Sequence, residues 1–64
     1  MTDRERVIVT KLAVAGEATT AGMIGWLGCD DRSARLCLGI MARCRTIIRV
    51  AEGSQTWRLG FSPP

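Results

Sequence analysis

The chain has 64 residues, of which 47% are hydrophobic and 23% are charged, and its formal net charge is +3. This length allows one small domain with a single core, and the composition argues against a disordered chain. No apolar run reaches the roughly 20 residues that a membrane-spanning helix needs, and the charged N-terminus does not resemble a secretory signal. The sequence therefore predicts a cytoplasmic protein with no membrane contact.

The first half of the sequence predicts two helices separated by a glycine turn. Ile8 and Leu12 follow helical spacing and predict a first helix over residues 3–15. A threonine cap and a terminal Gly28 predict a short second helix over residues 19–28.

A third helix, over residues 30–44, has two different sides. Ala34, Leu38 and Met41 form its apolar stripe. The opposite side gathers Arg32, Arg35, Leu36, Gly39 and Arg43. We expect the first side to face the core and the second to face a partner.

The last part of the sequence predicts a β-hairpin over residues 46–60. Residues 47–50 and 56–59 are predicted to form two strands around a turn, with Trp57 on the core side. The sequence thus predicts an α+β fold that is mainly α, with three helices followed by a two-stranded hairpin.

Charge is divided unequally between the two halves of the chain. Residues 1–31 carry three basic and five acidic side chains, whereas residues 32–64 carry six arginines and one acidic side chain. This segregation favours a polyanionic partner, although a merely solvated basic surface is the simpler alternative.

The order of elements resembles the winged helix-turn-helix domain of bacterial and phage transcriptional regulators. The resemblance covers nearly the whole chain and is carried by Gly16–Thr20, Met23–Gly28, Asp31–Arg35, Ile47–Val50 and Trp57–Leu59. It implies a bare DNA-binding head-piece, located with the nucleoid, that binds double-stranded DNA as a homodimer or cooperative oligomer. One departure is that the family usually has glycine after its third helix, where this chain has Arg45-Thr46.

The resemblance assigns DNA contacts to the third helix and to the hairpin, which is the wing of this family. Arg32 and Arg35 would contact base edges in the major groove, and Arg43 would meet phosphate. Arg49, on the wing, would lie along the backbone or in the minor groove, or serve only as a surface position. The complete set of candidate DNA contacts is Arg32, Ser33, Arg35, Leu36, Arg43, Arg49, Gln55 and Arg58.

The remaining residues give little support for catalysis or for a cofactor. The chain has no histidine or tyrosine and no glycine-rich phosphate loop, so we expect no enzyme. Cys29, Cys37 and Cys44 have no metal-binding spacing, which favours buried free thiols and no bound metal.

Three alternatives to duplex DNA binding remain open. A protein-interaction module would use the arginines against an acidic partner and Trp26 and Leu36 as anchors. A cysteine-based metal or redox sensor would carry iron or zinc. A binder of left-handed or single-stranded DNA would use the same charges.

Overall fold

The first helix, α1 (Asp3–Ala15), is fixed by its two ends. In the computed structural model, which describes residues 2–61, the Thr2 hydroxyl accepts a hydrogen bond from the Glu5 backbone N–H at 3.2 Å. Gly16 ends the helix with φ of 84°, a conformation that glycine adopts without the steric cost of a Cβ.

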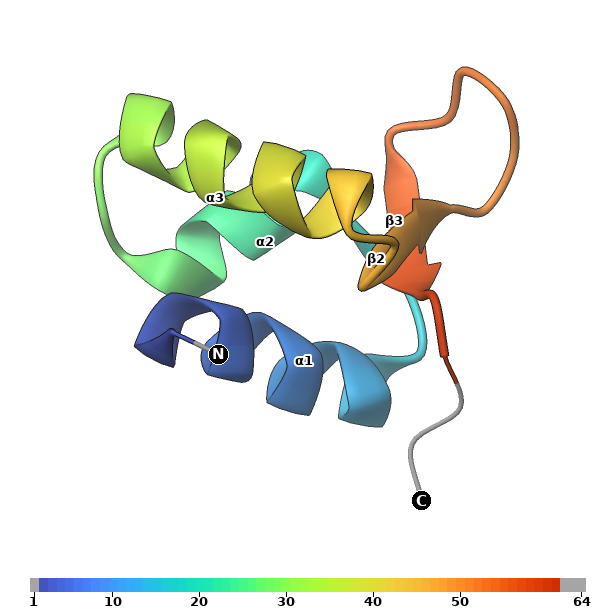
Figure 1. The fold of residues 1–64 in the computed structure, drawn as a ribbon, viewed down its shortest axis with the longest axis horizontal. Coiled ribbons are helices and arrows are strands. Elements are labelled where there is room, and N and C mark those ends of the chain that lie inside the picture. The colour runs from blue at the N-terminus through green and yellow to red at the C-terminus, as the bar shows by residue number, and fades with distance from the viewer. Residues whose placement is uncertain (1, 62–64) are drawn as a thin grey trace.

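Two further helices follow and start in the same way. The Thr19 hydroxyl caps α2 (Thr20–Leu27) and the Asp30 carboxylate caps α3 (Asp31–Arg43), each by accepting a hydrogen bond from a backbone N–H three residues later. Gly28 ends α2 in the left-handed conformation. In Figure 1, α3 lies along one side of the molecule and α1 along the opposite side.

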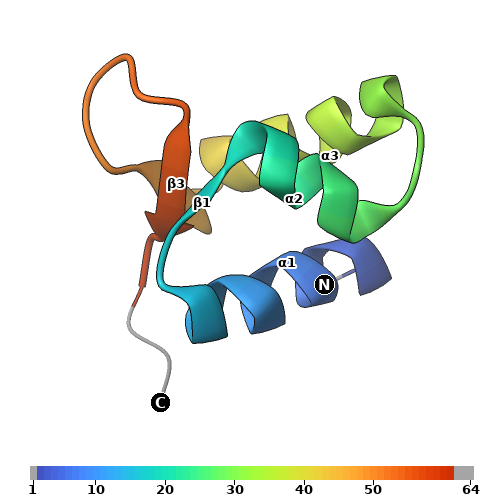
Figure 2. The same cartoon turned by 180° about the vertical axis from the view of Figure 1, so that it is seen from behind.

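The sheet has three antiparallel strands in the order β1-β3-β2, so the prediction of a two-stranded sheet was wrong. The additional strand is β1 (Ala18–Thr19), which pairs with β3 (Thr56–Leu59); on its other side β3 pairs with β2 (Ile47–Arg49). Figure 2 shows β1 beside β3 as the chain passes from α1 to α2. Two residues are too few to show the alternation that identifies a strand in a sequence.

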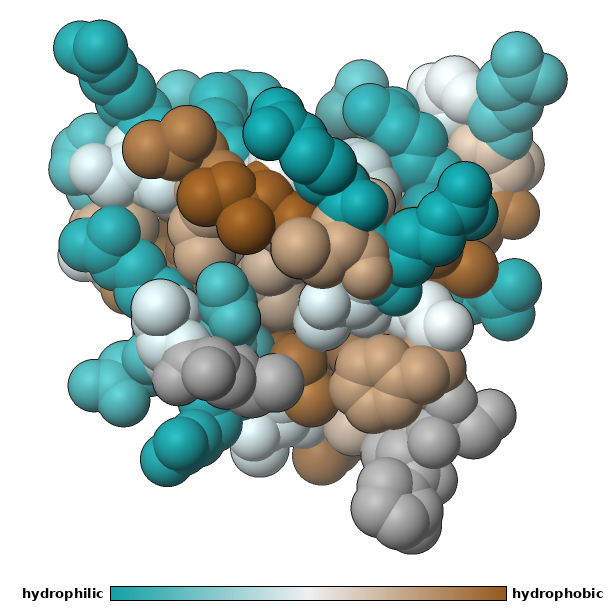
Figure 3. Space-filling view, in the orientation of Figure 1, coloured by the Kyte–Doolittle hydropathy of each residue, from teal (hydrophilic) through white to brown (hydrophobic). Residues whose placement is uncertain are grey.

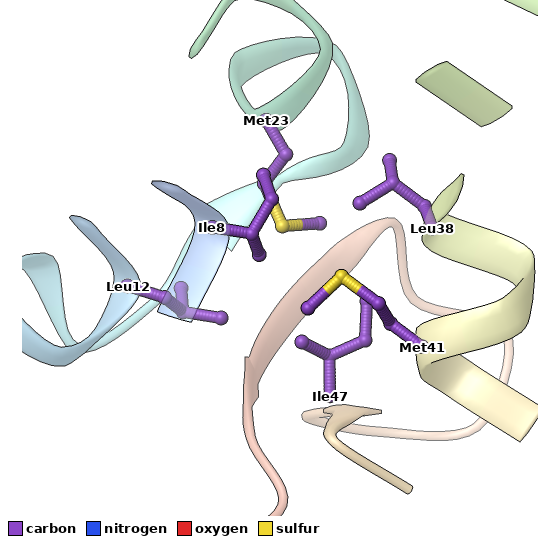
Figure 4. Packing of buried hydrophobic residues seen from close by; sticks show 6 residues of the cluster. All are labelled: Ile8, Leu12, Met23, Leu38, Met41 and Ile47. Atoms are coloured by element: carbon purple, nitrogen blue, oxygen red, sulfur yellow. The ribbon is translucent and has the colours of Figure 1, made fainter. Parts of the chain in front are cut away.

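The core gathers one or two side chains from each helix and one from the sheet. Its cluster of buried residues consists of Ile8, Leu12, Met23, Leu38, Met41 and Ile47, which point toward one another in Figure 4. Trp26 and Trp57 are partly buried against this cluster. The mostly helical α+β class predicted from the sequence is confirmed.

The cysteines differ from their predicted environment. Cys44 is exposed, and Cys29 and Cys37 are only half-buried, so none of the three is a buried core thiol. Cys44 is the C-cap of α3 and lies just beyond the last residue of the helix. No helix within residues 2–61 is long and apolar enough to cross a membrane.

Candidate nucleic-acid interface

The outward surface of α3 is divided lengthwise into two stripes. Arg32, Arg35 and Arg43 are exposed and follow helical spacing along one stripe, which we call the arginine edge. Leu36, Cys37 and Ile40 form the adjacent stripe, the apolar patch. The sequence placed Leu36 with the arginines, and in the structure it lies at the boundary between the two stripes.

Arg35 is oriented by the residue one turn before it. Its Nε donates to the Asp31 carboxylate at 2.7 Å, and both side chains are more than half exposed. Exposed pairs of this kind add only about 0.3–0.5 kcal/mol to stability. The contact occupies Nε and leaves the N–H donors of the two Nη groups for another acceptor.

The joint between α3 and β2 places an arginine where helices usually end in glycine. Arg45 has φ of 61° and is the one non-glycine residue with positive φ in the described chain. The Arg45 N–H donates to the Ala42 carbonyl and the Thr46 N–H to the Met41 carbonyl, which is the Schellman pattern of helix termination. The left-handed conformation costs about 1–2 kcal/mol for a residue with a Cβ.

Gly60, which follows β3, contacts the backbone of the α3–β2 joint. Its N–H donates to the Thr46 carbonyl at 2.9 Å. A Cβ at Gly60 would collide with the Arg45 backbone carbonyl. The chain after β3 therefore fixes the backbone of Arg45 by close approach.

Arg43, Arg45 and Arg49 line one hollow beside the Trp57 ring, which we call the basic hollow. Arg49 is held in it by two contacts. Its Nη1 donates to the Ser54 carbonyl at 2.7 Å, and its guanidinium lies 4.6 Å from the centroid of the Trp57 ring. The three guanidinium groups come from the end of α3, the joint and β2, so the basic hollow continues the arginine edge toward the hairpin.

Arg58 lies on the opposite face of the hairpin from Arg49. It pairs with Ile48 across the strands, whereas Arg49 pairs with Trp57, and side chains alternate between the two faces of a strand. Arg58 lines a different hollow, next to the C-terminal end of α1. The structure therefore separates Arg58 from the other predicted contacts.

Gln55 and Ser33 both take part in contacts within the fold. The Gln55 backbone carbonyl accepts from the Thr20 N–H at 2.9 Å, and its side-chain oxygen lies 3.3 Å from the Thr20 hydroxyl. That hydroxyl also accepts a hydrogen bond from Trp57 Nε1 at 2.8 Å. Ser33 is half-buried in the first turn of α3, where its backbone N–H donates a hydrogen bond to the Asp30 carboxylate.

The start of α3 is the acidic end of this surface. The Ser33 backbone N–H, followed by the Ser33 side chain, lowers the pKa of the Asp30 carboxyl below its ordinary value, and Arg4 adds to the shift. Asp30 thus stays ionised at neutral pH. This negative charge disfavours phosphate at the start of α3 relative to its C-terminal end, where Arg43, Arg45 and Arg49 line one hollow.

Arg45 lines the basic hollow but was not among the candidate DNA contacts predicted from the sequence. The signal was present, since Arg45-Thr46 stood out as a departure from the expected glycine. Among residues 2–61, no three cysteine or carboxylate side chains lie close enough to hold a metal ion. No family model, curated protein or solved structure matches this chain.

Proposed function

We propose that the chain is a winged helix-turn-helix protein that binds double-stranded DNA as a small transcriptional regulator. In this proposal α3 is the recognition helix and the β2–β3 hairpin is the wing. The observation that carries it is the continuity of exposed arginines from the arginine edge of α3 into the basic hollow. A continuous cationic surface of this kind is typical of proteins that bind a polyanion such as DNA.

The two parts of this surface are suited to different parts of a DNA duplex. Arg32 and Arg35 lie in the first half of α3, and their planar guanidinium groups can bond guanine O6 and N7 in a bidentate manner. Arg43, Arg45 and Arg49 surround a hollow, which suits a backbone phosphate between the helix and the wing. Figure 1 supports this use, since α3 and the β2–β3 loop lie on the same side of the molecule.

The strain at Arg45 is a second argument for an anionic partner. Glycine would adopt this conformation at no steric cost, so the arginine is kept against a local energetic disadvantage. Strained residues of this kind tend to occur at functional sites. A phosphate contact from Arg45 would supply the compensating gain.

The test is binding to random-sequence duplex DNA across a salt series. We compare wild type with Arg32→Ala/Arg43→Ala and with Arg6→Ala/Arg58→Ala, a control of equal net charge whose arginines lie on α1 and on the opposite face of the hairpin. We expect the first variant to lose roughly tenfold or more in affinity and the slope of log K against log salt to fall by up to about two.

The control variant should stay within about threefold of wild type, since only diffuse attraction is reduced. Equal losses in both variants would mean that net charge alone drives binding. Absence of binding at low salt by folded wild type would overturn the proposed function.

A further inference from the structure

The apolar patch on α3 combines two exposed side chains, Leu36 and Ile40, with the half-buried Cys37, which packs against the core cluster. Leu36 is 67% exposed and Ile40 is 45% exposed. They lie one helical turn apart and adjoin the half-buried Cys37. Figure 3 shows brown, hydrophobic side chains gathered over α3. Contiguous exposed apolar surface of this kind marks an interaction site.

The patch is hollowed on the side that faces α1. Residues 2–5, at the start of α1, line this hollow together with Ser33, Leu36, Cys37 and Ile40. Burial raises the pKa of the Cys37 thiol, and the nearby Glu5 carboxylate adds to the rise. The patch therefore offers both a projecting side chain, Leu36, and an apolar recess that can receive one.

The two borders of the patch carry opposite charge. One border is the arginine edge, with Arg32 and Arg43. The other border is the first turn of α1, which contains Asp3 and Glu5. Arg4 lies on this second border too, so residues 2–5 carry two acidic side chains and one basic side chain, and the border keeps a net charge of −1. The projecting Leu36 side chain of one copy can enter the recess of a second copy, and each charged border can meet a border of opposite charge. The patch is therefore complementary to the same patch on a second copy.

We propose that the apolar patch binds a second copy of the same chain in a two-fold symmetric contact. Leu36 and Ile40 of each copy pack against the patch of the other. An approximately parallel pairing of the two α3 helices sets the arginine edge of each copy against the acidic border of its partner. Because the contact is isologous, each charge complementarity is made twice.

The size of the chain limits the strength of this dimer. Its whole accessible surface is 4341 Å², of which a standard interface of about 800 Å² per partner would take roughly a fifth. The patch and its borders extend over only about three turns of α3. We therefore expect a weak dimer, with a dissociation constant of about 10–100 µM.

This contact would compete with DNA. It covers Arg32 and Arg43, so a copy held in the dimer cannot present its arginine edge to a duplex. DNA binding would then be favoured at low protein concentration, and self-association would limit it as the protein accumulates. This regulatory consequence rests on the proposed function, whereas the self-association does not.

The first arm of the test is sedimentation equilibrium of the full chain without DNA, from about 5 to 500 µM and in reductant, which prevents disulfide-linked dimers. We compare wild type with Leu36→Gln and with the matched control Val14→Gln, whose side chain is 88% exposed on α1. Both substitutions conserve charge and alter an exposed side chain, so both variants should fold, as circular dichroism checks.

We expect wild type and Val14→Gln to dimerise alike and Leu36→Gln to dimerise at least tenfold more weakly. High salt should weaken the wild-type dimer, because the charged borders contribute to it. A wild type that stays monomeric throughout, or equal losses in both variants, would overturn the proposal.

The second arm measures duplex DNA binding at protein concentrations well below the dimer range. The variant for this arm is Ile40→Gln, which alters the patch at an exposed residue outside the candidate DNA contacts. Wild type and Ile40→Gln should bind equally there, since both are monomeric. A loss of DNA affinity in Ile40→Gln would assign the patch to DNA and contradict the proposal. Absence of DNA binding by both chains would overturn the proposed function alone, because the first arm decides the dimer independently.

Discussion

Two helices of this protein are terminated by a residue of positive φ, but the two residues are of different types. Gly28 ends α2 at φ of 65°, and Arg45 follows α3 at φ of 61°. At Gly28 the residue type agrees with the geometry, as expected where only the turn matters. At Arg45 the residue type opposes the geometry, and the guanidinium lines the basic hollow. Under the proposed function, the α2–α3 turn serves stability, whereas the α3–β2 joint also presents Arg45 to an anionic partner.

The largest effect is expected at the residue that locks the second joint. Gly60→Ala would drive a Cβ into the Arg45 carbonyl, and we expect a loss of roughly 1–3 kcal/mol in the free energy of unfolding. Urea unfolding measures it. Gly25→Ala is the matched control, because nothing lies within 4 Å of its added Cβ, and it should stabilise α2 by up to about 1 kcal/mol. An unchanged midpoint for Gly60→Ala would show that the joint is not held by this close approach.

A smaller loss is expected at the first joint. Gly28→Ala places a Cβ in the left-handed conformation and should cost about 1 kcal/mol. The space around Gly28 is open, so the whole effect is conformational. Thermal unfolding measures the shift, and DNA affinity should not change. A loss of DNA binding by the folded variant would contradict the division between the two joints.

The sequence predicted the parts of this fold that depend on near neighbours. Helical spacing and polar cap residues act within one turn, so they indicate α2 and α3 from local pattern alone. By contrast, β1 is made by pairing with the distant β3, and Gln55 is held by Thr20 across the fold. Neither contact leaves a periodic trace in the sequence.

The residues of the candidate site likewise divide into those that local periodicity predicted and those that it did not. Periodicity placed Arg32, Arg35 and Arg43 on one side of a helix. It did not show that Arg49 and Arg58 point to opposite faces, because that depends on the register of the hairpin. Nor did it show that Arg45 shares a hollow with Arg43 and Arg49, since a joint has no period.

The smallest effect is expected at the start of α3, where the cap is ionised. The folded state lowers the pKa of Asp30, so its stabilising contribution is present above the ordinary carboxyl pKa and is lost as the pH falls through the folded-state pKa. Wild type should therefore melt at a higher temperature than Asp30→Asn at pH 7, and the difference should shrink as the pH falls below the ordinary carboxyl pKa. A difference that grows on acidification would contradict this assignment.

The most direct test of the division between the joints is Arg45→Gly. Glycine relieves the left-handed strain, so the variant should unfold at the same or slightly higher urea concentration, with a gain of up to about 1 kcal/mol. Its affinity for duplex DNA should nevertheless fall, with the salt slope reduced by about one. This opposite movement of stability and binding is the predicted result. Full wild-type affinity in the folded variant would contradict the claim that Arg45 is kept for an anionic partner.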